Sequence, residues 1–171
     1  DYFAENLAPK VYGRILQKKV YALHLCTPEK IMFPTGTIEN STMSSMDIGD
    51  AGQSKTVLAK IVIDNYCKGT QSKFISVENS STAGLTASNI KNKFTGGYSV
   101  KLGLLSSCNK NMAVLDGIGK LEQKDWSQLR GIKEEKVLEI AKTGNLKIPC
   151  SLRMVSCGNL IKPVREYYTK H

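Results

Sequence analysis

The sequence lacks a hydrophobic run long enough to cross a membrane. A spanning helix needs about 20 predominantly apolar residues, and the 171 residues, 41% of them hydrophobic, contain no such run. Residues 1–6 are polar and acidic, unlike a secretory signal peptide. We therefore expect one globular domain spanning residues 1–171, with no membrane partner, in the cytoplasm of a prokaryote or the nucleus of a eukaryote.

Closely spaced cysteine pairs are also missing. The chain has five cysteines, and no two of them form a CxxC pair. An odd and scattered set disfavours both a disulfide scaffold and a zinc site. It favours reduced thiols, as in a cytosolic protein.

Acidic residues are few. The chain has 15 Asp and Glu residues against 24 Lys and Arg residues, which gives a formal net charge of +9. Such a surplus fits a phosphate-rich partner, but it fits a solvated basic surface equally well. The lysines are dispersed and form no polybasic tail, which disfavours a membrane surface as the partner.

The most informative stretch that is present is Gly49-Asp50-Ala51-Gly52-Gln53-Ser54-Lys55-Thr56, which has the form of a phosphate loop. In such loops backbone N–H groups surround the β-phosphate, the lysine meets the β- and γ-phosphate oxygens, and the following hydroxyl holds Mg²⁺. The pattern has Gly where this chain has Ser54, and a positive φ is less favourable for Ser than for Gly. The alternative is a glycine-containing turn before an ordinary helix.

An apolar stripe follows the loop and predicts a helix after Lys55. Its members are Val57, Leu58, Ile61, Val62 and Tyr66. The residues before the loop, 44–48, are expected to form a buried strand, although two serines and an aspartate lie in it. Other patterns predict a helix over 15–26, a loop over 27–36, strands over 74–77 and 98–102, a polar insertion over 89–97, a helix over 121–130, and a hairpin with limbs 137–143 and 146–157.

A second chemically informative position is Asp116, at the end of the apolar run that begins at Met112. Buried parallel strands read as continuous apolar runs, and α/β folds bind ligands at the carboxyl ends of such strands. We therefore interpret Asp116 as a metal-facing acid. The alternative is a turn-forming Asp followed by Gly117.

Five segments, in one order along the chain, match the pattern of a known family. The octet 49–56 resembles the variant phosphate loop G-D-P-G-T-A-K-S, which has a small residue other than Gly before the lysine. Residues 7–13 are similar to I-A-P-x-I-Y-G, 81–87 to S-S-A-A-G-L-T-A, 140–144 to I-A-K-A-G, and 155–159 to a run ending A-A-A-N. From about residue 7 to residue 159 the chain thus resembles the AAA+ motor domain of minichromosome maintenance (MCM) replicative helicases.

This resemblance implies a fold and an activity. The implied fold is an α/β, three-layer αβα P-loop NTPase core with a mainly parallel sheet and MCM-type hairpin insertions. The implied activity is ATP hydrolysis coupled to translocation on DNA, as a hexameric ring of identical or similar subunits, in DNA replication. ATP and Mg²⁺ are the implied cofactors.

The resemblance also assigns roles to residues. Tyr12 and Gly13 are expected beside adenine, and the octet 49–56 around the phosphates. Thr56 and Asp116 are expected to hold Mg²⁺, with Asp116 as the Walker B carboxylate. Asn159 is expected to orient the attacking water or the γ-phosphate. Lys142, at a hairpin tip, is expected to bind DNA phosphates without reading bases; an ordinary exposed lysine is the alternative.

The chain departs from the family pattern in ways that favour a partly degenerate or incomplete domain. Gly117 stands where the family has the water-polarising Glu after the Walker B Asp, and Glu122 and Asp125 are the next carboxylates along the chain. The sequence is expected to contain neither the arginine finger and helical lid nor an N-terminal DNA-binding domain. The alternative function is a catalytically silent MCM-like paralogue or fragment that acts as an interaction module.

Overall fold

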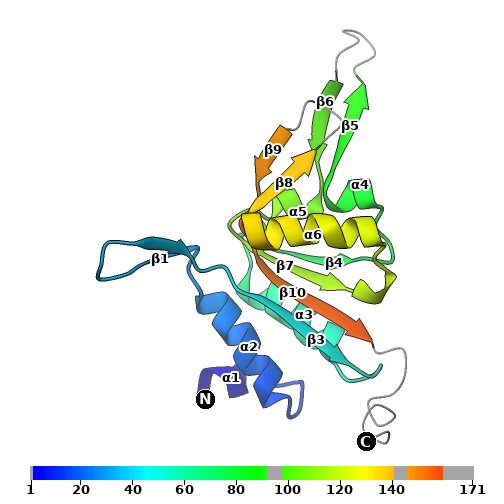
Figure 1. The fold of residues 1–171 in the computed structure, drawn as a ribbon. Helices are drawn as coiled ribbons and strands as arrows, with labels where there is room; N and C mark the ends of the chain where they lie inside the picture. Colours follow the sequence, from blue (N-terminus) through cyan, green and yellow to red (C-terminus); the bar gives the residue numbers. More distant parts are fainter. Residues whose placement is uncertain (1, 92–97, 141–145, 160–171) are drawn as a thin grey trace, which may run out of the picture.

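The computed structural model describes residues 2–91, 98–140 and 146–159, and its centre is a parallel four-stranded sheet (Figure 1). The strands lie in the order β3-β10-β7-β4, and every neighbouring pair is parallel. Their bounds are β3 Ser44–Gly49, β10 Arg153–Asn159, β7 Met112–Asp116 and β4 Lys73–Ser76. The predicted strand at 112–116 is confirmed.

Helices cover both faces of this sheet. Alternate residues of β7 belong to different hydrophobic cores: Met112 and Val114 to one, Ala113 and Leu115 to the other. The first core contains residues of the helices α2 and α3, and the second contains residues of α4, α5 and α6. The helix bounds are α1 Tyr2–Asn6, α2 Ile15–Cys26, α3 Lys55–Tyr66, α4 Thr82–Leu85, α5 Leu104–Ser107 and α6 Gln123–Glu135, and a short 3₁₀ helix covers Ile118–Lys120. The expected αβα layering is present.

The buried face of α3 differs from the predicted stripe. Leu58 and Val62 are buried as expected, together with Ala59 and Ile63. Val57 and Tyr66, in contrast, are 52% and 41% exposed. Val57, at the start of the helix, lines a cavity beside the phosphate loop, and Tyr66, at its end, forms an edge-to-face contact with Phe3.

The extent of α2 agrees with the prediction, but polar residues attach it to the sheet. Its Leu16 is 69% exposed, whereas His24 is fully buried. The Nε2 atom of His24 lies 2.7 Å from Oγ of Ser45 on β3, and Nη1 of Arg153 on β10 donates to the His24 carbonyl at 3.0 Å. Burial, and secondarily Arg153, lowers the pKa of His24 to about 4. Periodicity alone could not identify this polar attachment.

Within the described residues, three antiparallel strand pairs extend from the sheet layer (Figure 1). They are β1 Lys30–Met32 with β2 Ile38–Asn40, β5 Ala87–Lys91 with β6 Tyr98–Leu102, and β8 Val137–Ile140 with β9 Leu146–Pro149. Of the loop predicted over 27–36, residues 27–29 and 33–36 lie outside helices and strands as expected, whereas 30–32 form a strand. Gly36 adopts a φ of +82° and its N–H donates to the Phe33 carbonyl, which turns the chain back into the second strand. The strand predicted over 98–102 is confirmed, and α6 begins later and ends later than predicted.

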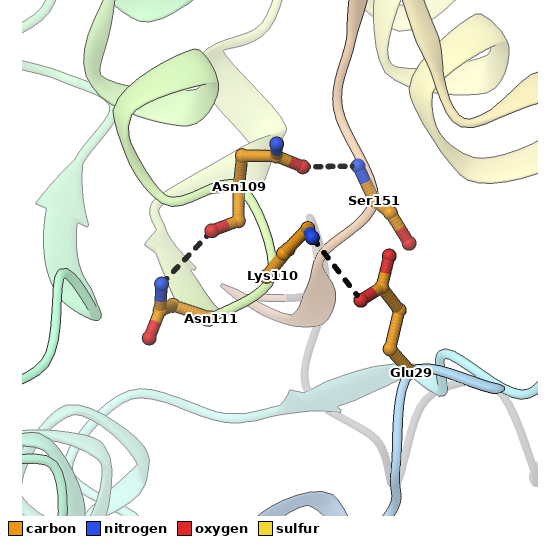
Figure 2. Close-up of polar contacts among 5 residues, drawn as sticks. All are labelled: Glu29, Asn109, Lys110, Asn111 and Ser151. Carbon is orange, nitrogen blue, oxygen red and sulfur yellow. Dashed lines mark hydrogen bonds and ion pairs between the residues drawn. The ribbon is translucent and has the colours of Figure 1, made fainter.

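The predicted return limb over 146–157 is two strands. Its first part, β9, pairs with β8, and its second part, β10, enters the central sheet. Figure 2 shows the junction, where the N–H of Ser151 donates to Oδ1 of Asn109 at 2.8 Å and Nζ of Lys110 lies 4.0 Å from Oε2 of Glu29. The Lys110 N–H donates in turn to the Ser151 carbonyl at 2.6 Å. These contacts connect the turn before β7 to the start of β10, so the two strands run in register to their carboxyl ends.

The strand that precedes the phosphate loop is less buried than expected. β3 lies at one edge of the sheet, and its Met46 and Ile48 are 51% and 49% exposed. Its Ser45 and Asp47 are less exposed than these apolar residues, and Ser45 contacts the buried His24. In the described part of the chain, no helix combines the length and the apolar character needed to span a membrane.

Candidate nucleotide-binding site

The octet 49–56 forms a tight loop between the end of β3 at Gly49 and the start of α3 at Lys55. Gly52 and Ser54 adopt positive φ angles of 76° and 57°. Ser54 thus adopts the left-handed conformation in place of the usual glycine, although a positive φ is less favourable for Ser. Strand, loop and helix follow one another in the arrangement that directs helix N-terminal N–H groups toward an anion.

The ammonium group of Lys55 lies inside this loop. The side chain is buried, and Nζ donates to the carbonyls of Gly49 at 2.9 Å and Asp50 at 2.6 Å. A buried cation needs acceptors, and carbonyl dipoles provide them here. Phosphate oxygens at the same position would provide stronger, charged acceptors.

Gly49 allows the loop to close on itself. A Cβ atom at this position would lie 2.5 Å from Oε1 of Gln53 and 3.9 Å from Nζ of Lys55. A side chain there would push Gln53 away from the loop. The absence of a side chain at Gly49 thus keeps Gln53 and Lys55 close to the backbone of the loop.

Thr56 and Asp116 are neighbours, as the sequence predicts for two residues that hold one metal ion. Oγ1 of Thr56 donates to Oδ2 of Asp116 at 3.0 Å. A hydroxyl and a carboxylate are hard oxygen ligands, and Mg²⁺ in proteins commonly takes one or two such groups together with water and substrate phosphates. The residues present therefore fit Mg²⁺.

The loop and the strand ends enclose a cavity of about 370 Å³. Asp116 ends β7, and Asn159 ends the adjacent strand β10, paired in register with Gly49. Because parallel strands end at the same edge of a sheet, both side chains face the loop. The cavity is lined by Ala51, Gly52, Gln53, Ser54, Lys55, Thr56, Val57, Ser76, Glu78, Asp116, Gly117, Gly158 and Asn159.

Five residues of this cavity were not predicted as site residues: Val57, Gly117, Gly158, Ser76 and Glu78. The last two, Ser76 and Glu78, come from the end of β4 and the turn after it. Ser76 ends β4 and pairs in register with Asp116. The signal that would have identified them is the position of the strand predicted over 74–77, whose carboxyl end must lie beside that of β7 if the two strands are neighbours. Strand order is not readable from local sequence patterns, so this signal was not available.

Four predicted site residues within the described part of the chain do not line this cavity: Gly49 and Asp50 of the loop, Tyr12 and Gly13. Tyr12 is fully exposed, Gly13 has a φ of +67°, and neither lines this cavity. Their place beside adenine stays a prediction. Lys142 lies outside the described residues.

The carboxylates of Glu122 and Asp125 cap the N-terminus of α6. The Asp125 carboxylate accepts the Glu122 N–H at 3.2 Å, and the two residues form a reciprocal capping box at the start of α6. Glu122 also forms an ion pair with Lys124 at 2.7 Å. Neither residue lines the cavity beside Asp116, so neither replaces the carboxylate missing at Gly117.

Comparison with known proteins gives the family. The model of the MCM P-loop domain matches residues 1–161. The chain is 28% identical over 139 residues to the DNA replication licensing factor mcm6 of Schizosaccharomyces pombe, which covers 81% of this chain and 15% of the relative. It is 26% identical over 160 residues to the minichromosome maintenance protein MCM of Saccharolobus solfataricus, which covers 93% of this chain and 23% of the relative.

A third relative, the DNA replication licensing factor mcm-5 of Caenorhabditis elegans, is 26% identical over 144 residues, covering 84% of this chain and 19% of the relative. The chain thus spans less than a quarter of the length of these relatives. The matched residues include the loop, both strand ends at the cavity and the parallel sheet that positions them. The chain belongs to the MCM family and has its α/β P-loop NTPase fold.

Proposed function

We propose that this chain is the ATP-binding and ATP-hydrolysing core of an MCM-like DNA helicase that acts in DNA replication. The observation that carries the proposal is the cavity in which Lys55, Thr56, Asp116 and Asn159 meet. The residues come from one loop and two adjoining strands, so their convergence is a property of the fold. The family relationship and the names of the relatives support replication as the process.

Each residue has a definite task in this proposal. Lys55 exchanges its two carbonyl acceptors for β- and γ-phosphate oxygens and neutralises their charge. Thr56 and Asp116 hold Mg²⁺, which when bound offsets negative charge on the phosphates. Asn159 donates a hydrogen bond that orients the attacking water or the γ-phosphate, and Tyr12 and Gly13 lie along the adenine.

DNA is the proposed polymer partner, and other MCM-like subunits, identical or similar, are the proposed protein partners in a hexameric ring. Lys142 is the proposed contact to the DNA backbone. A lysine that neutralises phosphates gives binding that depends on salt and tolerates any base sequence. The formal net charge of +9 is consistent with such a partner.

A second candidate is a catalytically silent module that docks onto helicase subunits. Gly117 favours it, because a glycine after Asp116 has no group to polarise water. The rate of ATP hydrolysis separates the two candidates, since the silent module can hold nucleotide but does not turn it over.

The test measures ATP turnover and single-stranded DNA binding together, on the full-length protein, across a salt series. We expect hydrolysis of ATP, and DNA affinity that falls as salt rises. Lys142→Ala should reduce the slope of log affinity against log salt by about 1, whereas the exposed Lys68→Ala should leave it unchanged. Tight ATP binding with no turnover, with or without DNA, would favour the silent module instead.

A further inference from the structure

Glu78 is a second carboxylate at the proposed hydrolytic site. It has no role in the metal binding proposed for Asp116. Of the carboxylates that line the cavity, Asp116 accepts a hydrogen bond from Thr56 at 3.0 Å. Glu78 also lines the cavity, and among the described residues it has neither a hydrogen bond nor an ion pair. Its side chain is exposed to the cavity and to solvent. The Asp116 carboxylate is therefore bonded to Thr56 at the proposed metal site, whereas the Glu78 carboxylate can accept a proton or a hydrogen bond from a ligand in the cavity.

The backbone holds Glu78 close to the end of β7. Immediately before it, the N–H of Val77 donates to the carbonyl of Asp116 at 2.9 Å. Immediately after it, the hydroxyl of Ser80 donates to the carbonyl of Ser76 at 2.8 Å, which closes the turn. The main-chain bond from Val77 thus fixes the start of this turn beside Asp116, and the Ser80 hydroxyl closes the turn around Glu78.

Gly117 leaves room for the Glu78 side chain. A Cβ atom built at Gly117 would lie 3.3 Å from Cγ of Glu78 and 3.9 Å from its Cδ and Oε1. The side chain of Glu78 therefore packs against the point where a side chain at position 117, directly after Asp116, would begin. The φ of +83° at Gly117 further disfavours a side chain there.

We propose that Glu78 is the general base of this site and supplies, from the turn after β4, the carboxylate that Gly117 does not. The proposal rests on the proposed ATP hydrolysis. In the step, the oxygen of a water molecule bonds to the γ-phosphorus while the bond from that phosphorus to the β,γ-bridging oxygen breaks. The bonding pair stays on the β-phosphate of ADP. The proton of the water passes to Oε of Glu78 and then to solvent, which restores the carboxylate.

The test compares Glu78→Gln with the wild type, in the full-length protein, for both ATP binding and ATP turnover. Glutamine keeps the size of the side chain but removes its basicity, so kcat should fall by about 10²- to 10⁴-fold while affinity for ATP changes little. Glu134→Gln is the matched control, because this exposed glutamate lies on α6 and pairs with Arg130 at 3.0 Å. It should leave kcat unchanged.

A chemical rescue separates a base from a structural residue. Glu78→Ala leaves space beside Asp116, so added formate should restore part of the lost turnover in this variant and should do nothing for the wild type. A residue that acts only through folding would not respond to formate. Thermal unfolding of both variants near that of the wild type should accompany this result.

The outcomes distinguish this proposal from the proposed function. If wild-type protein binds no ATP, the proposed function itself fails. If the wild type binds ATP but does not hydrolyse it, or if Glu78→Gln hydrolyses it at the wild-type rate, Glu78 is not the base, and nucleotide binding still stands.

Discussion

The two halves of the nucleotide cavity are built in different ways. The phosphate-binding half is one continuous stretch, residues 49–56, in which Lys55 and Thr56 follow directly from the loop that positions them. The half that faces it is assembled from two strand ends and the turn after a third strand, with Asp116, Asn159 and Glu78 contributed by segments far apart in the chain. The first half keeps the form typical of a phosphate loop. In the second, Gly117 follows Asp116 and Glu78 lies nearby.

This difference suggests that the two halves tolerate change differently. A loop whose backbone binds phosphate depends on local geometry, so each of its positions is constrained by the next. A set of carboxylates at a sheet edge depends only on which side chains reach the cavity, so a carboxylate can be supplied from a neighbouring strand. The further inference about Glu78 follows from this second kind of construction.

The largest expected effect is the loss of ATP affinity when the phosphate-binding half is altered at Lys55. Lys55→Ala removes the cation that faces the phosphates, and losing one partner of a buried charge pair costs about 2–5 kcal/mol, or about 30- to 4,000-fold in affinity. Titration of Mg²⁺-ATP into each protein measures the loss. Lys55→Met repeats the test with more of the side-chain volume retained.

Lys60→Ala is the matched control for this change. Lys60 lies on the same helix, and its ammonium is 5.0 Å from the centre of the Phe74 ring, outside the cavity. It should leave ATP affinity unchanged. Equal losses in the two variants would mean that general positive charge, and not the loop, binds the nucleotide.

A smaller effect concerns β3, the strand that leads into the phosphate loop. His24 anchors α2 to β3 through Ser45, and its pKa is lowered from 6.5 to about 4, chiefly by burial. Between these values the unfolded chain binds a proton that the folded chain does not. The contribution of neutral His24 to the free energy of unfolding is therefore fully present above pH 6.5. It falls by roughly 3 kcal/mol as the pH drops through 4.

Urea unfolding at pH 7.5 and pH 4.5 measures this effect. We expect His24→Gln to reduce the dependence of stability on pH relative to the wild type. Asp47, whose pKa is raised mainly by burial, acts in the opposite direction, and it is present in both proteins, so the difference between them isolates His24. Parallel pH profiles for the two proteins would contradict the assignment.

Features formed by one continuous stretch of sequence could be predicted, and features assembled from distant segments could not. The phosphate loop, the helix after it and the apolar strand ending at Asp116 were predictable because each is a local pattern. On α2, the burial of His24 and the exposure of Leu16 were not predictable. They depend on polar contacts of α2 with β3 and β10, which the apolar stripe does not indicate. Glu78 was not predictable either, because its place beside Asp116 depends on β4 pairing with β7.

The hairpins mark a second limit. Turn signals at Pro34 and Gly36 predicted a loop, yet the flanking residues Lys30–Met32 and Ile38–Asn40 pair as strands. Each of these strands is only three residues long, and all its residues are exposed, so no alternation of buried and exposed positions indicates it. Short exposed strands are visible only in the folded chain.

The central claim is that the cavity between the loop and the strand ends binds a nucleoside triphosphate. Isothermal titration calorimetry of the wild-type protein with ATP, with and without Mg²⁺, tests it most directly. The account predicts saturable binding of one ATP per chain that is tighter with Mg²⁺, because Thr56 and Asp116 lie in contact beside Lys55. Absence of ATP binding under both conditions would contradict it.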